Sequence, residues 1–483
     1  MELSFRQEER EEESSPASTE PWAGTPSSGR GWYRLYLALL GPILFLYILF
    51  DRGFAHVHVP GTPLYVGESL LCVGVMALLS GTHYVRRAIT REPLLALMGV
   101  FMLWGLARTL PNISSYGVLN CLQDAALWYY CLFAFLIVAA SIAFPEAPDR
   151  LTKGFQRVLP WILVWLPIAA LLPKVGIAGP DLPTSDVAFF THKIGNIEVV
   201  IAMCLGVLWL LPNDARSKRS RNLLSLVALF GLMISATQSR GGAVAALIAS
   251  AFGFFLMSGK RPALIALAKG LVVAGLLFGL AWTTNFTVHT SKRDLSVQQL
   301  ITNAESVTGG NQLQGTITWR ENLWRTIVSK EVSSGKLAIG FGMGPNLALL
   351  AGLPERQAEN PALELRSPHD SHIDVLARMG VIGAAMWLLL WIGWTVMMFR
   401  ARSRLKRSGS RYSRGVIELC LVSVVAILTN CIFDPTLEGA QVAALTWTVF
   451  GIGLVVARRA GQDSQEDVVV VARSSPASLS QAV

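Results

Sequence analysis

The chain has 483 residues, of which 52% are hydrophobic and 15% are charged, and its mean hydropathy is +0.46. This composition excludes an ordinary soluble protein of the same length and indicates an integral membrane protein whose first partner is the lipid bilayer. The formal net charge of +9 is scattered over many short loops, so it predicts no nucleic-acid-binding domain.

Both ends of the chain are polar. Residues 1–31 are rich in Glu, Ser, Pro and Gly. Residues 459–483 contain several charged and polar residues and no aromatic side chain. We expect two disordered cytoplasmic tails, because such segments bury too little apolar surface to fold. No cleavable signal peptide is recognisable, so the first apolar span is expected to remain as a helix.

Apolar segments follow one another along most of the chain. Runs of roughly 17 to 25 apolar residues are long enough to cross about 30 Å of hydrocarbon as helices. We count about twelve, nine in residues 32–283 and three in residues 371–458, and predict an all-α fold, a polytopic membrane helical bundle. The predicted spans are Tyr33–Phe50, Leu64–Ser80, Leu94–Leu110, Leu122–Phe144, Val158–Leu172, Gly195–Leu211, Leu223–Thr237, Ala243–Met257, Ala263–Trp282, Met379–Phe399, Val416–Phe433 and Ala440–Val456.

Basic residues gather in alternate loops between these spans. The clusters are Arg86, Arg87 and Arg91; Arg150, Lys153 and Arg157; residues 216–221; Lys260 and Arg261; and residues 400–414. This is the positive-inside pattern, so we assign these loops to the cytoplasm. Residues 173–194 and 284–370 then lie on the opposite side. The second segment is a large loop, and loops of that length in compact proteins are usually functional.

Two parts of the large loop carry candidate binding residues. Residues 316–330 have apolar positions close to helical spacing and contain Arg320 and Arg325, although an ordinary amphipathic surface helix would look the same. A glycine-rich turn follows, with Gly342 and Gly344. Glycines at these places allow backbone conformations beside a ligand or a helix that other residues rarely adopt.

Some charged residues lie where membrane proteins seldom place them. Arg240 sits in the turn Gln238–Gly242 between two spans on the outer side, where it calls for an anionic partner or else snorkels beside the glycines. Arg108 and Asp124 lie in consecutive spans near their outer ends. We expect these two residues to form a structural ion pair, because an unpaired charge in lipid is costly.

The segment Arg366–Asp374 (RSPHDSHID) concentrates titratable residues before a long apolar span. We expect Pro368 to open a helix that carries His369 and His372. An imidazole has the side-chain pKa nearest neutrality, so a histidine at a membrane boundary is a candidate proton acceptor. The His-x-x-His spacing would also suit a metal ion, but no third ligand is evident, and we predict no metal site.

Three motifs, in this order, resemble those of the O-antigen ligase and polymerase superfamily of bacterial polytopic membrane glycosyltransferases. Ser239-Arg240-Gly241 is similar to the family's Ser-Arg-Gly turn. Arg320 with Trp324 is similar to its Arg-x-x-x-Trp segment. His369, Asp370, a gap of nine residues and then Gly380 to Gly383 resemble the ligase signature. Asp370 replaces the family's neutral amide or hydroxyl, and a carboxylate there is expected to raise the pKa of the histidine.

The resemblance implies a metal-independent glycosyltransferase without a cofactor, in the bacterial inner membrane, with its large loop and active site in the periplasm. It would transfer a glycan from an undecaprenyl-diphosphate-linked donor to a hydroxyl acceptor. Arg240 and Arg320 would bind the diphosphate oxygens, and His369 would take the proton of the attacking hydroxyl. The residues assigned to substrate binding are Arg325, His372, Gly342, Gly344 and Arg108.

Alternatives remain open at this stage. The acceptor is lipid A-core, a growing glycan or a protein side chain; the histidine signature favours a ligase-like enzyme, and a repeat-unit polymerase is the alternative. A secondary transporter is a second alternative, with Glu68, Asp124 and Lys269 carrying coupled ions. The enzyme requires Arg240, Arg320 and His369 to meet at one place, whereas transport requires the charged residues of the spans to line one pore.

Overall fold

The structure, a computed structural model, describes residues 29–59, 64–177, 179–182, 187–212, 216–285, 287–288, 295–307, 314–352 and 366–474. These residues form an almost wholly helical fold, which confirms the predicted fold class. Its strands in the described ranges are the short β1 (Thr287–Val288) and β2 (Leu295–Ser296), which pair antiparallel. Residues 1–28 and 475–483 of the predicted tails lie outside the described residues.

Each predicted apolar span coincides with a helix or with a bent pair of helices. The helices are α1 (Arg30–Ala55), α2 (Val66–Ser80), α3 (Thr82–Arg91), α4 (Pro93–Thr109), η1 (Leu110–Asn112), α5 (Ile113–Tyr116), α6 (Val118–Tyr129), α7 (Leu132–Ala143), α8 (Ala147–Leu171), η2 (Leu172–Val175), α9 (Ile194–Leu210), α10 (Lys218–Ala236), α11 (Arg240–Leu256), α12 (Arg261–Thr283), α13 (Val297–Val307), α14 (Gln314–Ser333), α15 (Leu347–Leu350), α16 (Ser371–Ser408), α17 (Arg411–Cys431), η4 (Thr436–Glu438) and α18 (Ala440–Ser474).

Fewer described helices are long and apolar enough to cross a membrane than there are predicted apolar spans. Among the described residues, seven helices are long and apolar enough to cross a membrane, or up to nine if each of two bent pairs, α2 with α3 and α6 with α7, is one span. Helices α9 and α11 are apolar but only 17 residues long. Twelve crossings therefore stay a prediction.

The last helix is longer than expected. Helix α18 continues to Ser474, so residues 459–474, which we assigned to a disordered tail, are helical. A helix that has already formed extends at little cost until a residue stops it, and the next proline is Pro476.

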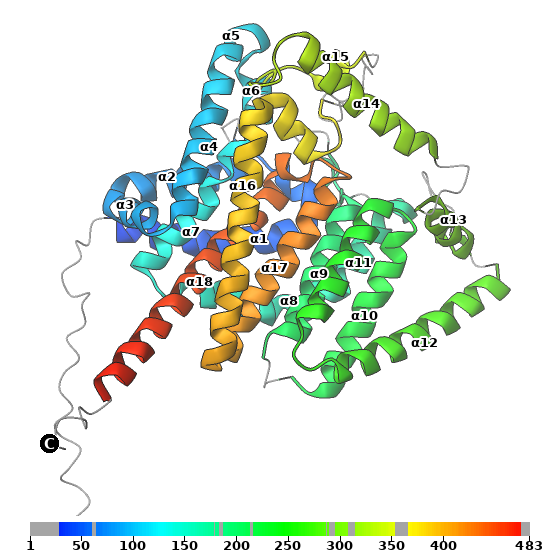
Figure 1. Cartoon of the computed structure of the whole chain (residues 1–483). Coiled ribbons are helices and arrows are strands. Elements are labelled where there is room, and N and C mark those ends of the chain that lie inside the picture. The colour runs from blue at the N-terminus through cyan, green and yellow to red at the C-terminus, as the bar shows by residue number, and fades with distance from the viewer. Residues whose placement is uncertain are drawn as a thin grey trace, which may run out of the picture.

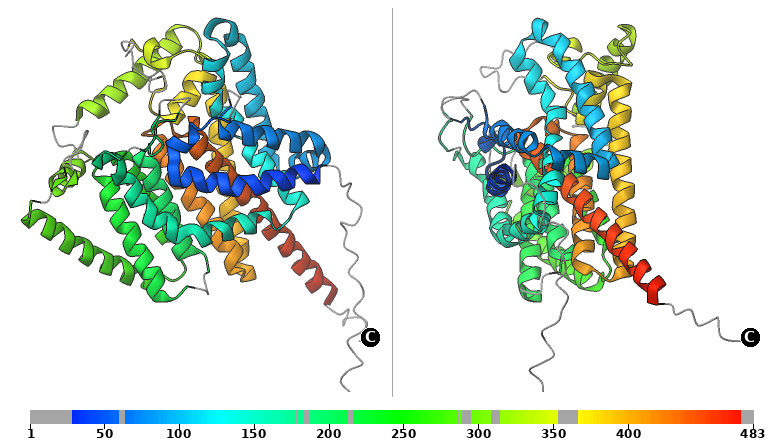
Figure 2. Two further views of the ribbon diagram at one scale, coloured as in Figure 1. Left: turned by 180° about the vertical axis from the view of Figure 1, so that it is seen from behind. Right: turned by 90° about the vertical axis from the view of Figure 1, so that its left-hand side faces the viewer.

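The core of the bundle lies where α9, α11 and α17 pack together and where α18 packs against α7, α16 and α17. Trp387, Trp391, Trp394, Trp447 and Phe450 fill the contact between α16 and α18. Helix α1 crosses behind the long helix α16, and α12 extends away from the bundle (Figures 1 and 2). Most side chains of α12 are exposed, and its main packing is against α10.

The loops that we assigned to the outer side meet at one end of the bundle. Twelve spans with both tails in the cytoplasm leave six outer loops, and contacts between these loops connect all six into one layer. The hydrogen bonds that join the loops are Gly53 N to Thr191 O (3.1 Å), Lys193 Nζ to Asp434 Oδ1 (3.0 Å), Asn112 Nδ2 to Met343 O (2.8 Å) and Asn303 Nδ2 to Thr237 O (2.9 Å). The charge interactions of Arg320 and His369 with Asp434 add a further link. This layer is the outer-loop layer.

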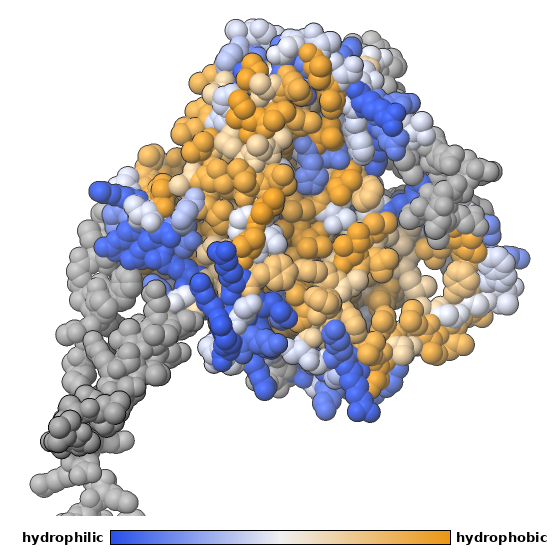
Figure 3. All heavy atoms as spheres, viewed as in Figure 1, coloured by the Kyte–Doolittle hydropathy of each residue, from blue (hydrophilic) through white to orange (hydrophobic). Residues whose placement is uncertain are grey.

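The loops rich in basic residues meet at the other end. There Arg458 pairs with Glu92 (3.2 Å), Arg459 pairs with Asp149 (3.1 Å), and Arg402 donates to the carbonyl of Leu256 (2.7 Å). On the face in Figure 3, hydrophobic residues cover the middle and hydrophilic residues gather at the lower end. The alternation of loops read from the basic clusters thus agrees with the fold, while the membrane side that each end faces stays a prediction.

Candidate functional site

His369 lies just before α16 in a strained backbone conformation. Asp370 caps the helix: its Oδ1 accepts hydrogen bonds from the backbone N–H groups of His372 (2.7 Å) and Ile373 (3.0 Å). His369 has φ 56°, a left-handed value that costs a non-glycine residue about 1–3 kcal/mol. Such a conformation persists only where neighbouring contacts impose it, so the backbone at His369 is held by its surroundings.

Two expectations for this segment are wrong. Pro368 does not open the helix, because Asp370 is the N-cap and α16 begins at Ser371. Asp370 does not raise the pKa of His369, because its carboxylate is directed at the helix N-terminus, and the pKa of the histidine is in fact lowered. His369 and His372 therefore do not share one helix face.

Helix α14 of the large loop holds His369 in place. The indole N–H of Trp324 donates to the carbonyl of Pro368 (2.8 Å), and the ring of Trp319 meets the imidazole of His369 edge to face, with ring centroids 6.0 Å apart. Arg320 lies between these two tryptophans in sequence. The Arg-x-x-x-Trp segment thus brings its arginine near the histidine.

Three charged groups, Asp434, Arg320 and Lys193, act on the imidazole of His369. Lys193 Nζ pairs with Asp434 Oδ1 at 3.0 Å. Burial lowers the pKa of His369; Asp434 acts against this shift, and Arg320 and Lys193 act with it. The imidazole is therefore neutral near pH 7 and able to accept a proton, and Asp434 would stabilise the imidazolium that forms.

Arg320 presents a partly buried guanidinium to this group. Burial lowers its pKa, and the carboxylates of Asp434 and Asp370 act in the opposite direction; an arginine nevertheless remains charged in proteins. In the described part of the chain its buried Nε has no hydrogen-bond partner. A buried cationic donor without a partner is suited to binding an anionic group of a substrate.

Arg240 is the first residue of α11, in a turn that packs against α9 and the end of α17. Ser239 Oγ caps the helix by accepting from Gly242 N (3.2 Å). A Cβ at Gly241 would lie 2.5 Å from Cβ of Phe433, and one at Gly242 would lie 2.0 Å from Oε2 of Glu198. The two glycines therefore let the turn approach α9 and the end of α17. Gly241, the residue after Arg240, thus packs on Phe433, the residue that precedes Asp434.

The three predicted catalytic residues are thus brought to the outer-loop layer. Arg320 and His369 interact with Asp434, and the turn of Arg240 packs on the preceding Phe433. Sequence reasoning missed Lys193 and Asp434. The available signal was their position, because Lys193 lies two residues before one predicted span and Asp434 directly follows another on the outer side.

Gly380, the first glycine of the ligase-like signature, has a structural role. Helix α16 is broken at Gly380, which has φ 69° and ψ −173°. A Cβ there would lie 2.3 Å from the carbonyl oxygen of Ala338. Backbone groups near the break bind the loop before Gly344: Val381 N to Leu337 O (2.9 Å), Ile382 N to Ala338 O (3.2 Å), Phe341 N to Ala377 O (2.7 Å) and Gly342 N to Arg378 O (3.0 Å).

Gly342, Gly344 and Arg108, which we assigned to substrate binding, serve this packing. Gly342 has φ +85° and its backbone lies against Asn112 and the carbonyl of Arg108, while Gly344 has φ +110° and donates its N–H to Asp124 (2.8 Å). Arg108 Nη2 donates to the carbonyl of Gly340 (3.1 Å). All three hold the glycine-rich turn on the outer ends of α4 and α6.

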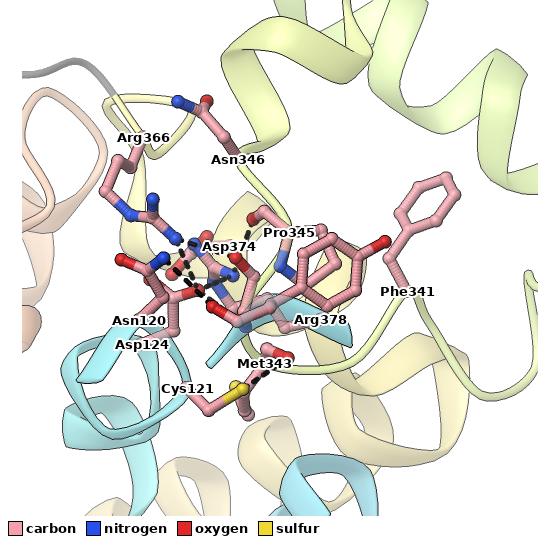
Figure 4. Close-up of polar contacts among 12 residues, drawn as sticks. Asn120, Cys121, Asp124, Phe341, Met343, Pro345, Asn346, Arg366, Asp374 and Arg378 are labelled. Atoms are coloured by element: carbon pink, nitrogen blue, oxygen red, sulfur yellow. Dashed lines mark hydrogen bonds and ion pairs between the residues drawn. The ribbon is translucent and has the colours of Figure 1, made fainter. Parts of the chain in front are cut away.

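The expected ion pair between Arg108 and Asp124 is not formed. Asp124 instead binds Arg378 Nη1 (2.6 Å) and lies 3.5 Å from Arg366 Nη2, and Arg378 Nε also binds Asp374 (2.9 Å) (Figure 4). The fully buried Arg378 of α16, and not Arg108 of the neighbouring span, is therefore the arginine that neutralises the Asp124 carboxylate. The i, i+4 spacing of Asp374 and Arg378 was the readable signal for part of this network.

Arg325 and His372 do not join the group around His369. The Arg325 side chain is 80% exposed and lies 3.8 Å from Glu321 on the outer face of α14. His372 has both ring nitrogens engaged: Nδ1 accepts from the indole of Trp387 (3.2 Å), and Nε2 contacts the carbonyl of Leu428 (3.1 Å). In the described ranges, no group of three or more His, Cys, Asp or Glu could hold a metal ion.

Comparison with known proteins links this site to a protein family. Residues 223–388 match the family described as O-antigen ligase. The matched segment extends from α10 into α16 and contains Arg240, Arg320 and His369, whereas Lys193 and Asp434 lie outside it. No curated protein matches the chain.

Proposed function

We propose, from the membership of this chain in the O-antigen ligase superfamily, that it transfers a glycan from a polyprenyl-diphosphate-linked donor to a hydroxyl acceptor. The chain is a multi-pass membrane protein with a domain of the O-antigen ligase and polymerase type of glycosyltransferase. The observation that carries the proposal is the meeting of Arg320, His369 and Asp434, next to the turn of Arg240, in the outer-loop layer.

The donor diphosphate would bind to the cations of this group. Guanidinium forks match phosphate oxygens in a bidentate geometry, so Arg240 and Arg320 are suited to holding the diphosphate, with the ammonium of Lys193 close by. They would also stabilise the negative charge that develops on the leaving diphosphate. The surrounding apolar helices would hold the polyprenyl chain in the membrane.

His369 is proposed as the general base. Its neutral imidazole would take the proton of the acceptor hydroxyl as that oxygen attacks the anomeric carbon, and the bond from this carbon to the diphosphate oxygen would break. The diphosphate leaves with the electron pair, and a single displacement inverts the configuration of the anomeric carbon. General base catalysis of this kind typically contributes about 10²–10⁴ in rate. We propose that no metal ion or cofactor takes part.

The acceptor distinguishes the possible enzymes of this superfamily. The His369 signature with Gly380 favours a ligase-like enzyme, which would use lipid A-core in the bacterial inner membrane with the site facing the periplasm. A repeat-unit polymerase, with the growing glycan as acceptor, is the second candidate, because it would use the same donor and the same arginine and histidine residues.

The charged residues that transport would need have three separate surroundings. Glu68 accepts hydrogen bonds from Tyr129 (3.2 Å) and Tyr130 (2.6 Å), and Asp124 is bound in the network of Arg378. Lys269 is exposed on α12, which extends away from the bundle. This arrangement favours the enzyme over the secondary transporter.

The direct test is transfer from a lipid-linked donor by the purified full chain in proteoliposomes. We expect His369→Gln to reduce the transfer rate by about 10²–10⁴. Arg325→Gln is the control, because Arg325 is exposed on the far face of the same helix as Arg320, and it should keep nearly the full rate. Near-normal transfer by His369→Gln would refute the role of His369.

A further inference from the structure

Helix α3 turns sharply away from α2 at the basic end of the bundle. The two helices meet at an angle of 89° around Gly81. Helix α3 has the sequence THYVRRAITR, which contains three arginines and is too polar to cross a membrane. If α2 is a membrane span, α3 therefore runs along the membrane surface.

The side chains of α3 are sorted onto three faces. Tyr84 and Ala88 are buried against the protein, and Tyr84 meets Tyr33 of α1 edge to face with ring centroids 5.5 Å apart. Val85 is partly exposed and Ile89 is exposed, one helical turn apart, on a second, apolar face. The arginines occupy the remaining surface. A helix with protein-facing, apolar and basic faces has the composition expected at the boundary between acyl chains and lipid headgroups.

The exposed arginines form a cluster with α18. Arg86, Arg87 and Arg91 are exposed, and none has an ion-pair partner within 4 Å in the part of the chain that the structure describes. Arg91 lies close enough to Arg87 and to Arg458 of α18 to be repelled by both positive charges. The carboxylate of Glu92, the next residue after Arg91, is already bound to Arg458 (3.2 Å). The cluster consequently favours an external anion.

We propose that α3 and the adjacent start of the polar part of α18 bind the phosphate headgroup of an anionic phospholipid. The basic residues contact the headgroup, and Val85 and Ile89 enter the acyl region beside it. An acidic soluble protein would account for the arginines but not for the neighbouring exposed apolar face. This site lies at the end of the bundle opposite to His369 and does not depend on the proposed glycosyl transfer.

The test uses native mass spectrometry of the purified full chain in a neutral detergent. Phosphatidylglycerol, phosphatidylcholine of the same acyl length, and inorganic phosphate are titrated separately. We expect phosphatidylglycerol to bind about tenfold or more tightly than phosphatidylcholine, because each arginine near a headgroup adds to the attraction. Inorganic phosphate at the same concentration should not displace the lipid.

The test variant is Arg86→Gln/Arg87→Gln/Arg91→Gln, and we expect it to lose this preference. The matched control is Arg400→Gln/Lys406→Gln/Arg407→Gln, which removes three exposed basic residues from α16 at the same end and should keep the preference. If the test variant melts earlier than the control in phosphatidylcholine, Arg86→Gln/Arg87→Gln replaces it. Equal loss in test and control variants, an absent preference in the unmodified chain, or displacement by inorganic phosphate would each overturn the proposal.

Discussion

Replacing Arg378 tests how the outer end of α16 is held. Its guanidinium is fully buried and binds Asp374 at 2.9 Å, Asp124 at 2.6 Å and the carbonyl of Pro345 at 3.3 Å. Arg378→Met keeps most of the side-chain volume but leaves two buried carboxylates without this cation. Breaking a buried ion pair from one side costs about 3–5 kcal/mol, so we expect a loss of that size in the free energy of unfolding.

The assay is reversible unfolding of the full chain in mixed detergent micelles. Arg325→Met is the matched control, since it removes an exposed arginine whose partner is 3.8 Å away, and it should change the free energy by no more than about 0.5 kcal/mol. The double variant Asp374→Asn/Arg378→Met should lose less than the sum of the single variants, by about 0.5–3 kcal/mol, because the two side chains interact directly. A cost below about 1 kcal/mol for Arg378→Met, or strict additivity, would refute this account of the network.

Three further predictions concern the site and the loops around it. The pKa of His369 lies below its ordinary value of about 6.5, so transfer should persist below that pH and fall only when the imidazole becomes protonated. Asp434→Asn removes a charge that raises this pKa, so the acidic limb of the pH–rate profile should move to lower pH. A shift to higher pH would contradict the arrangement. Burial raises the pKa of Glu331 to about 7, above its unfolded value, so the stability that this group contributes is present at low pH and is lost as the pH rises through about 7. Glu331→Gln should therefore raise the melting temperature at pH 8 and leave it nearly unchanged at pH 4. Equal changes in melting temperature at both pH values would be inconsistent with the burial. Gly242→Ala places a methyl group 2.0 Å from Oε2 of Glu198 and should lower the free energy of unfolding by about 1–3 kcal/mol. Gly275→Ala is the control and should not destabilise α12, because no neighbouring atom lies within 4 Å of the added methyl group. Equal melting temperatures for the two variants would argue against the close packing at the Arg240 turn.

The helices were largely predictable because they depend on local sequence. Runs of apolar residues located a helix or bent helix pair at each expected span, and the alternate basic clusters anticipated the two ends of the bundle. The end of α18 was not predicted, since the polar composition after Arg458 resembles a tail although nothing stops the helix before Ser474. The count of membrane crossings depends on segments as short as α9, which sequence length alone does not decide.

The site was only partly predictable because its contacts join distant parts of the chain. Arg320 and His369 were located by their motifs, and their approach to each other agrees with the resemblance. Asp124 was assigned to Arg108, its neighbour in the next span, but it binds Arg378, which is 254 residues away. Sequence spacing cannot rank such partners, because the choice between them depends on which helices pack together.

The most direct measurement is single-turnover transfer by His369→Gln, with donor binding measured on the same preparation. We expect the polyprenyl-diphosphate donor to bind within about twofold of its affinity for the unmodified chain while the transfer step slows by about 10²–10⁴, because the arginines bind the diphosphate and the imidazole takes the proton. Unchanged transfer, or loss of donor binding as large as the loss of transfer, would contradict this division of roles.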